Sequence, residues 1–166
     1  MAKQTKPQYQ IIVSTLRRDG LHNAALPETF RALGQAVRRL NDLERRALPF
    51  QLFNLRGLEP GADPSPAGFR PRVRDLRPAI LYAVKASPYP EGREPEGFVV
   101  PWFTAWGRTE AEARGLFLHS ARERRAYHVH RVKALTLDQE RAILAAGDNL
   151  AERLRLARKY GEGARA

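Results

Sequence analysis

The chain has 166 residues, of which 43% are hydrophobic and 28% are charged, a composition typical of a globular protein that can bury a core. Cysteine is absent, which excludes disulfides, thiolate nucleophiles and cysteine-ligated metal sites. No apolar run approaches the ~20 residues that a membrane-spanning helix needs, and the stretch 11–13 is too short for a signal peptide. We therefore expect one cytoplasmic domain over residues 1–166, without membrane association.

Arginine dominates the charge of this chain. There are 29 basic and 18 acidic residues, a net charge of +11, and only five of the basic residues are lysines. A guanidinium group places two N–H donors on a phosphate and stacks on bases, so this composition favours nucleic acid as the partner. A general bias of composition towards arginine, as in GC-rich coding or adaptation to heat, is the alternative explanation.

The first part of the chain predicts strand, helix and strand. Residues 8–16 alternate apolar and other side chains, which predicts a strand, and Asp19-Gly20 predicts a turn after it. From Pro27, at a first helical position, apolar residues recur at spacings of three and four as far as about Pro49, which predicts an amphipathic helix. A short strand is expected over 50–55.

Residues 59–78 are too rich in proline for regular structure and predict a loop. At its end the sequence reads Arg70-Pro71-Arg72-Val73-Arg74. Alternating arginines in an extended, proline-stiffened segment project along one side, as a clamp for phosphates requires.

The second part of the chain predicts three strands and two helices. Alternating apolar residues predict strands over 79–86, 98–106 and 126–135. Two capping boxes, Thr109 with Glu112 and Thr136 with Gln139, each predict the start of a helix, and the second opens a terminal helix over about 137–160. The resulting order predicts an α+β fold: a mainly antiparallel sheet of about five strands with three helices, in a ferredoxin-like or split βαβ arrangement.

Three groups of basic residues are the candidate phosphate contacts. The first lies on the predicted first helix, where Asp42 and Glu44 stand at pairing distance and can neutralise part of it. The second is in the proline-rich loop, and the third spans the end of the second helix and the fifth strand. The groups are Arg38, Arg39, Arg45 and Arg46; Arg70, Arg72 and Arg74; and Arg122, Arg124, Arg125, Arg131 and Lys133.

Two tryptophans are candidates for base stacking. In the strand predicted over 98–106, Trp102 and Trp106 share a face. If that face is exposed beside arginines, each indole can stack on an unpaired base. The alternative is that both tryptophans belong to the core.

One histidine pair suggests a different function. The segment His128-Val129-His130 resembles the His-hydrophobic-His motif of the HUH single-strand endonucleases, which include relaxases and small transposases. The resemblance implies a divalent metal held by His128 and His130 and a helix tyrosine that attacks the scissile phosphate, for which Tyr160 is the candidate. The chain departs from the family pattern because no third ligand is evident and no lysine follows Tyr160 at helical spacing.

A second resemblance covers residues 80–121. The segments Gly97-Phe98-Val99-Val100-Pro101 and Gly107-Arg108-Thr109-Glu110, which lead into a helix, resemble the partial RNase-H-like domain of HicB-type antitoxins. No pair of helices for DNA binding clearly follows.

Together these patterns predict a small, basic, non-enzymatic protein without a cofactor, which binds DNA or RNA by contacting phosphates through its arginine clusters. Two alternatives stay open. One is an HUH-type, metal-dependent single-strand endonuclease or transposase-like protein, and the other is a protein-interaction adaptor of the phage or mobile-element type.

Overall fold

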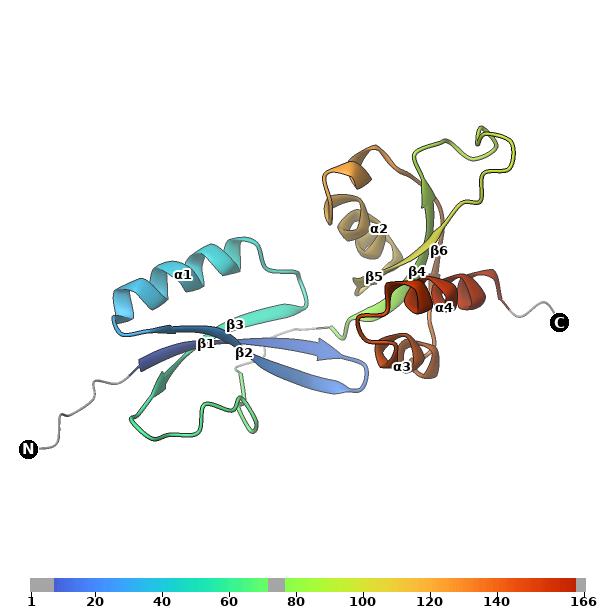
Figure 1. Ribbon diagram of the computed structural model, residues 1–166. Coiled ribbons are helices and arrows are strands. Elements are labelled where there is room, and N and C mark those ends of the chain that lie inside the picture. Colours follow the sequence, from blue (N-terminus) through green and yellow to red (C-terminus); the bar gives the residue numbers. More distant parts are fainter. Residues whose placement is uncertain (1–7, 72–76, 164–166) are drawn as a thin grey trace, which may run out of the picture. The chain divides into compact units, whose positions relative to one another are not determined.

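The computed structural model describes residues 8–71 and 77–163, and the chain divides into two compact units, Met1–Pro78 and Ala79–Ala166 (Figure 1). Each unit contains one three-stranded antiparallel sheet. Within the described ranges, no helix is both long enough and apolar enough to cross a membrane.

The first unit is a sheet with one helix. Its central strand is β1 (Gln8–Arg17), its edge strands are β2 (Gly20–Phe30) and β3 (Gln51–Leu58), and the helix α1 (Leu33–Arg45) connects the two edges. The predicted turn joins β1 to β2 through two residues, and Gly20 after it has a φ of 131°, which favours glycine. Consecutive strand residues face opposite sides of a sheet, so the complete burial of both Ile11 and Ile12 means that both faces of β1 are covered.

The helix predicted from Pro27 begins later, and that part of the prediction is wrong. Residues 20–30 form β2 instead, because pairing with β1 outweighs their weak strand propensity. The register of the pair jumps from Gln10 opposite Thr29 to Ile12 opposite Ala25. Pro27 lies inside this irregular stretch of an edge strand, where its missing N–H is tolerated.

An arginine fixes the proline-rich loop to the sheet. Arg56 on β3 donates hydrogen bonds to the carbonyl oxygens of Pro64 (2.7 Å) and Ser65 (2.8 Å). Its Nη2 also donates to Oε1 of Gln10 on β1 (2.7 Å). The described part of the loop, residues 59–71, is irregular as predicted and lies on the side of the sheet opposite α1 (Figure 1).

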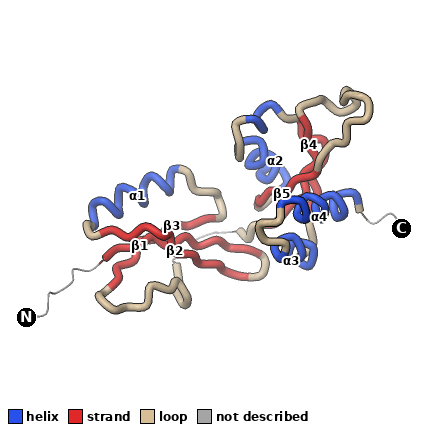
Figure 2. Tube along the Cα trace, viewed as in Figure 1, coloured by secondary structure: helices blue, strands red, loops and turns tan. Residues whose placement is uncertain are grey.

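The second unit repeats the first arrangement and adds two helices. Its first strand is again central and its next two strands are the edges, connected by a helix and a short 3-10 helix; two further helices follow (Figure 2). The elements are β4 (Ile80–Ser87), β5 (Trp102–Gly107), α2 (Glu110–His119), η1 (Glu123–Ala126), β6 (His128–Ala134), α3 (Leu137–Ala145) and α4 (Leu150–Glu162).

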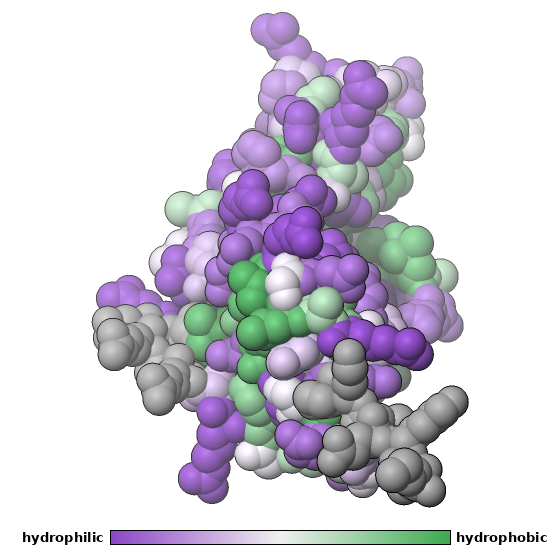
Figure 3. Space-filling model, turned by 90° about the vertical axis from the view of Figure 1, so that its left-hand side faces the viewer, coloured by the Kyte–Doolittle hydropathy of each residue, from purple (hydrophilic) through white to green (hydrophobic). Residues whose placement is uncertain are grey.

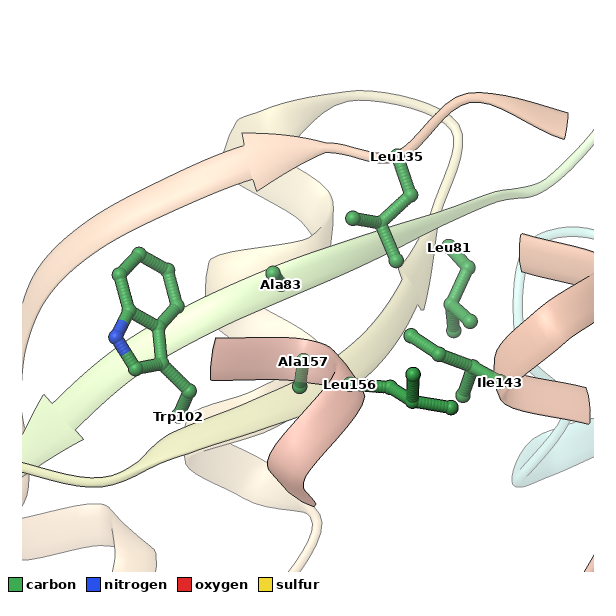
Figure 4. Close-up of a cluster of buried hydrophobic side chains, with 7 residues drawn as sticks. All are labelled: Leu81, Ala83, Trp102, Leu135, Ile143, Leu156 and Ala157. Atoms are coloured by element: carbon green, nitrogen blue, oxygen red, sulfur yellow. The ribbon is translucent and has the colours of Figure 1, made fainter. Parts of the chain in front are cut away.

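The sheet of the second unit has a hydrophobic cluster on each face. Alternate residues of β4, such as Tyr82 and Val84, pack with Phe117 of α2. The intervening residues face the other way, towards α3 and α4, and Figure 4 shows this second cluster. Its buried members are Leu81, Ala83, Trp102, Leu135, Ile143, Leu156 and Ala157.

The α+β class is confirmed, whereas the predicted number and grouping of elements is wrong. The described residues form six strands in two sheets and four α-helices, instead of about five strands in one sheet and three helices. No sheet formed by these residues has the four strands of a ferredoxin-like domain. Each sheet does contain a helix-connected pair of parallel edge strands around an antiparallel central strand, which is the split βαβ arrangement.

The helix predicted as continuous over about 137–160 is interrupted. Gly147 has a φ of 55°, and Asn149 starts α4 as its N-cap, with Oδ1 accepting a hydrogen bond from the backbone N–H of Glu152 (3.1 Å). A glycine followed two residues later by asparagine ends one helix and begins another. The sequence Gly147-Asp148-Asn149 itself carries this signal.

Of the two predicted capping boxes, one forms completely. Thr136 and Gln139 cap each other's backbone N–H at the start of α3. At the start of α2, Thr109 accepts from the N–H of Glu112, but the Glu112 carboxylate binds the backbone and side chain of Arg108 instead of the N–H of Thr109. That carboxylate is therefore half of an ion pair as well as a cap.

Candidate nucleic-acid interface

The basic residues of α1 are largely occupied within the first unit. Arg39 binds both carboxylate oxygens of Glu28 on β2 (3.0 and 3.1 Å), and these hydrogen bonds and the charge of Glu28 raise the pKa of Arg39. Asp42 accepts from Arg39 (3.4 Å) and forms an ion pair with Arg46 (3.2 Å), as its spacing predicts. The two remaining members, Arg38 and Arg45, each bond a carbonyl oxygen of their own helix. Two of the four candidates thus have acidic partners.

The arginines of the proline-rich loop are only partly described. Arg70 is exposed at the end of the described segment, whereas Arg72 and Arg74 lie outside the described residues. The predicted phosphate clamp therefore stays a prediction.

The structure divides the third basic group between the two faces of the second sheet. Arg124 in η1 lies on the face that α2 covers. Its guanidinium carbon is 5.1 Å from the ring centroid of Phe103 and 4.8 Å from that of Phe117. Lys133 on β6 belongs to the other face, since its Nζ donates to the carbonyl oxygen of Tyr160 on α4 (2.8 Å). Arg131 is on the same face as Lys133, two residues before it on the strand.

We call the three basic residues of the α2 face, Arg122, Arg124 and Arg125, the η1 arginines. Arg124 is held by its two aromatic contacts and by a hydrogen bond from Nη1 to Ser120 Oγ (2.8 Å). Arg122 and Arg125 are exposed. Within the described part of the chain none of the three forms an ion pair, so their charges are available to a ligand.

The two tryptophans are parts of the core, and the prediction of an exposed aromatic face is wrong for Trp102. That side chain is 3% exposed, because α4 covers it, and the ring would lie 2.3 Å from a Cβ added at Gly161. Trp106 is partly buried and packs against the same cluster. Trp102 therefore presents no open face on which a base can stack, and the stacking role of Trp106 stays a prediction.

The histidine pair is occupied in a way that argues against a metal centre. The ring of His130 is nearly buried, with Nε2 at 3.0 Å from the carbonyl oxygen of Tyr89 and Nδ1 at 3.3 Å from Oε1 of Glu94. Both ring nitrogens of His130 therefore contact the segment that precedes β5. The side chain of His128, in contrast, is exposed. Among the described residues, no group of three or more metal-ligating side chains is suited to a metal ion.

A β-bulge changes the register around these histidines. Val132 lies opposite Val84 and Val129 lies opposite Ala86, so one extra residue is inserted between them. Both valines consequently pack in the α2 cluster. Strict alternation along this strand would place Val132 on the same face as His128 and His130, and the bulge overturns that expectation.

Tyr160 is a packing residue in this structure. It lies in the last turn of α4 and is partly buried against the cluster shown in Figure 4. The Nζ of Lys159 lies 5.7 Å from the centroid of its ring. Its backbone carbonyl accepts from Lys133. The role of attacking nucleophile stays a prediction with no structural support.

Sequence reasoning missed two cations that the structure brings beside Arg131. Lys85, on the central strand β4, and Arg158, on α4, line a hollow with Arg131. A lysine within an otherwise apolar central strand was the available signal, because such strands rarely carry a charge without a reason. In the space-filling view of Figure 3, hydrophilic residues cover most of the visible surface, and hydrophobic residues gather in a few places.

Comparison with known proteins assigns this chain to no family. No known protein family, no curated protein and no solved structure matches this chain. The resemblances to the HUH endonucleases and to HicB-type antitoxins therefore have no further support.

Proposed function

We propose that this chain is a non-enzymatic nucleic-acid-binding protein of the cytoplasm, without a cofactor, that contacts phosphates through the η1 arginines. The observation that carries the proposal is the difference between this group and the arginines of α1. Two arginines of α1 are paired with carboxylates, whereas none of the η1 arginines has an acidic partner among the described residues.

The arrangement of η1 suits a phosphate backbone. Arg124 is held in place by two aromatic rings and by Ser120, so less side-chain entropy is lost when its outer N–H groups meet a phosphate. Arg125 follows it in the same short helix, Arg122 is the N-cap of that helix, and both are exposed. Contacts of this type position a strand but do not read its sequence.

The test is a salt titration with the whole chain. Binding of labelled single-stranded DNA, single-stranded RNA and duplex DNA is measured by fluorescence anisotropy between about 50 and 200 mM salt. We expect the logarithm of the affinity to fall linearly with the logarithm of the salt concentration, because each neutralised phosphate releases counterions. Absence of binding to all three polymers at low salt, or binding that salt does not change, contradicts the proposal.

A matched pair of double variants locates the interface. In Arg122→Gln with Arg125→Gln, we expect the slope of the salt plot to decrease by about 1.5 to 2, since two phosphate contacts are lost. The control, Arg39→Gln with Arg46→Gln, removes the same charge from residues already paired with acids. If the slope decreases equally in both double variants, binding depends on net charge alone, and the η1 arginines are not the interface.

A further inference from the structure

A polar hollow lies on the α4 face of the second sheet, away from the η1 arginines. Its volume is about 470 Å³, and Lys85, Trp102, Arg131, Arg158 and Glu162 line it. All five residues belong to the second unit. The hollow is therefore defined by elements that are placed relative to one another.

Strand register brings three of these side chains together. Lys85 on the central strand lies directly opposite Trp102 on β5 and directly opposite Arg131 on β6. Residues paired across strands point to the same face of a sheet. Trp102 belongs to the cluster beneath α4, so Lys85 and Arg131 also face α4.

The last turn of α4 closes the hollow from above. Gly161 lies against the ring of Trp102 so closely that an added Cβ would meet it. This contact holds Arg158 and Glu162 near the strands, and Arg158 Nε donates to Glu162 Oε1 (3.0 Å). Lys133 Nζ, which caps the Tyr160 carbonyl, compensates the negative end of the α4 dipole.

The lining carries three cations and one carboxylate. The carboxylate of Glu162 balances Arg158, but the side chains of Lys85 and Arg131 form no hydrogen bond or ion pair with any residue that the structure describes. Two like charges directly opposite each other destabilise a sheet. An anion bound between Lys85 and Arg131 attracts both side chains and so offsets the repulsion between them.

Trp102 contributes an unused donor. Its side chain is 3% exposed, and Nε1 is buried without a hydrogen-bond partner. In Figure 4 this nitrogen points away from the other labelled side chains of the cluster. A buried indole N–H usually has an acceptor, and a ligand in the hollow can supply one.

We infer that this hollow binds a phosphate group, held by Lys85, Arg131 and Arg158 with the indole N–H of Trp102 as a further donor. The volume exceeds that of a phosphate ion and falls within the range of sites for small phosphorylated molecules, so part of the attached molecule enters with the phosphate. The inference goes beyond the proposed function, because the site is on the other face of the sheet from η1 and needs no polymer.

The test uses the whole chain and five probes: inorganic phosphate, adenosine 5′-monophosphate, adenosine, and a short oligonucleotide both with and without a 5′-phosphate. Calorimetry measures binding, and tryptophan fluorescence reports whether the cluster that contains Trp102 and Trp106 is affected. We expect the monophosphate to bind and to change the fluorescence, and adenosine to do neither. If the 5′-phosphorylated oligonucleotide binds more tightly than the monophosphate, the phosphate is that of a strand end; equal affinity assigns it to a free monoester.

Variants separate the hollow from general charge. Lys85→Met and Arg131→Gln should each weaken binding of the monophosphate at least tenfold, and Glu162→Gln should strengthen it. The control is Arg155→Gln, which removes one charge from the same helix outside the hollow, where Arg155 is paired with Glu152. Circular dichroism checks that each variant is folded.

Failure of this inference is distinct from failure of the proposed function. The double variant Arg122→Gln with Arg125→Gln should bind the monophosphate normally. Absence of monophosphate and phosphate binding, or an equal loss in Arg155→Gln and Lys85→Met, overturns the assignment of the hollow and leaves the η1 proposal standing on its own salt titration.

Discussion

The two units of this chain share one arrangement of strands but differ in what surrounds their basic residues. Both run strand, strand, helix, strand, with the first strand in the centre of the sheet. The first unit, residues 1–78, contains 14 basic and 7 acidic residues, and the second, residues 79–166, contains 15 and 11. The larger surplus thus belongs to the first unit.

Surplus charge and available charge are different quantities. In the first unit, Glu28 and Asp42 hold Arg39 and Arg46, and four basic residues lie outside the described ranges. In the second unit the acids that form ion pairs lie mostly along helices, such as Glu152 with Arg155. Lys85, Arg122, Arg125 and Arg131 are left without acidic partners among the described residues. The positions of the carboxylates, and not the net charge of a unit, therefore decide which of its basic side chains are free of an acidic partner.

The largest expected effect concerns the two helices that only the second unit has. In Gly161→Ala, the new Cβ falls within 2.3 Å of the Trp102 ring, which must shift together with α4. Alanine is otherwise the better helix former, but overpacking of a core costs about 1 to 3 kcal/mol. We expect a lower free energy of unfolding, measured by denaturant titration with tryptophan fluorescence. A variant as stable as the parent shows that α4 does not pack tightly on the sheet.

The corresponding contact of the first unit is the arginine that holds the proline-rich loop. Arg56→Met keeps the aliphatic stem and removes three hydrogen bonds, to Gln10 and to the carbonyls of Pro64 and Ser65. Bonds from a charged donor contribute about 1.5 to 3 kcal/mol when buried, and partial exposure lowers this, so we expect a loss of about 1 to 2 kcal/mol.

Limited proteolysis distinguishes a local from a global effect of Arg56→Met. Cleavage within residues 59–71 should become faster, because the loop loses its attachment to β3. Arg38→Met is the control, since Arg38 bonds only a carbonyl of its own helix. Equal cleavage rates in the two variants contradict the role assigned to Arg56.

The strands and helices with strong periodicity could be predicted from sequence, but their grouping could not. The apolar alternation of β1 and β4 and the capping box of α3 gave the correct element types. β2 was missed because residues 20–30 include alanines, a proline and an asparagine, whose strand state depends on pairing with β1. No local sequence pattern indicates that the six strands form two separate sheets.

The candidate site shows the same limit. Residue type identified the basic groups, but the partner of Arg39 is Glu28, eleven residues away on a strand that was expected to be part of a helix. The bulge in β6 likewise adds one residue that no composition signal marks. Lys85 meets Arg131 only through long-range strand register. Local sequence patterns carry no information about such contacts.

A smaller effect is expected from the ion pair that begins α2. Hydrogen bonds from Arg108 lower the pKa of Glu112, against the opposing effect of its partial burial. A lowered pKa in the folded state means that the stabilisation is complete above the ordinary pKa of the carboxylate and is lost as the pH falls through the lowered value. Glu112→Gln should cost about 1 kcal/mol at neutral pH and less in acid, measured by denaturant titration across this range. A loss that does not depend on pH indicates that the N-cap geometry, not the charge, stabilises the helix.

The smallest effects test whether the two units unfold together, as the prediction of a single domain requires. Gly34→Ala in α1 and Gly115→Ala in α2 each place a Cβ where no atom lies within 4 Å, so each should stabilise its helix by up to about 1 kcal/mol. Both tryptophans belong to the second unit, so their fluorescence follows that unit, whereas far-ultraviolet circular dichroism follows both. If the chain is one cooperative domain, Gly34→Ala raises the midpoint seen by fluorescence as much as Gly115→Ala does, and the two signals coincide. A fluorescence midpoint that responds to Gly115→Ala alone shows that the two units fold as separate domains. The difference in charge environment is then a difference between two independently folding domains.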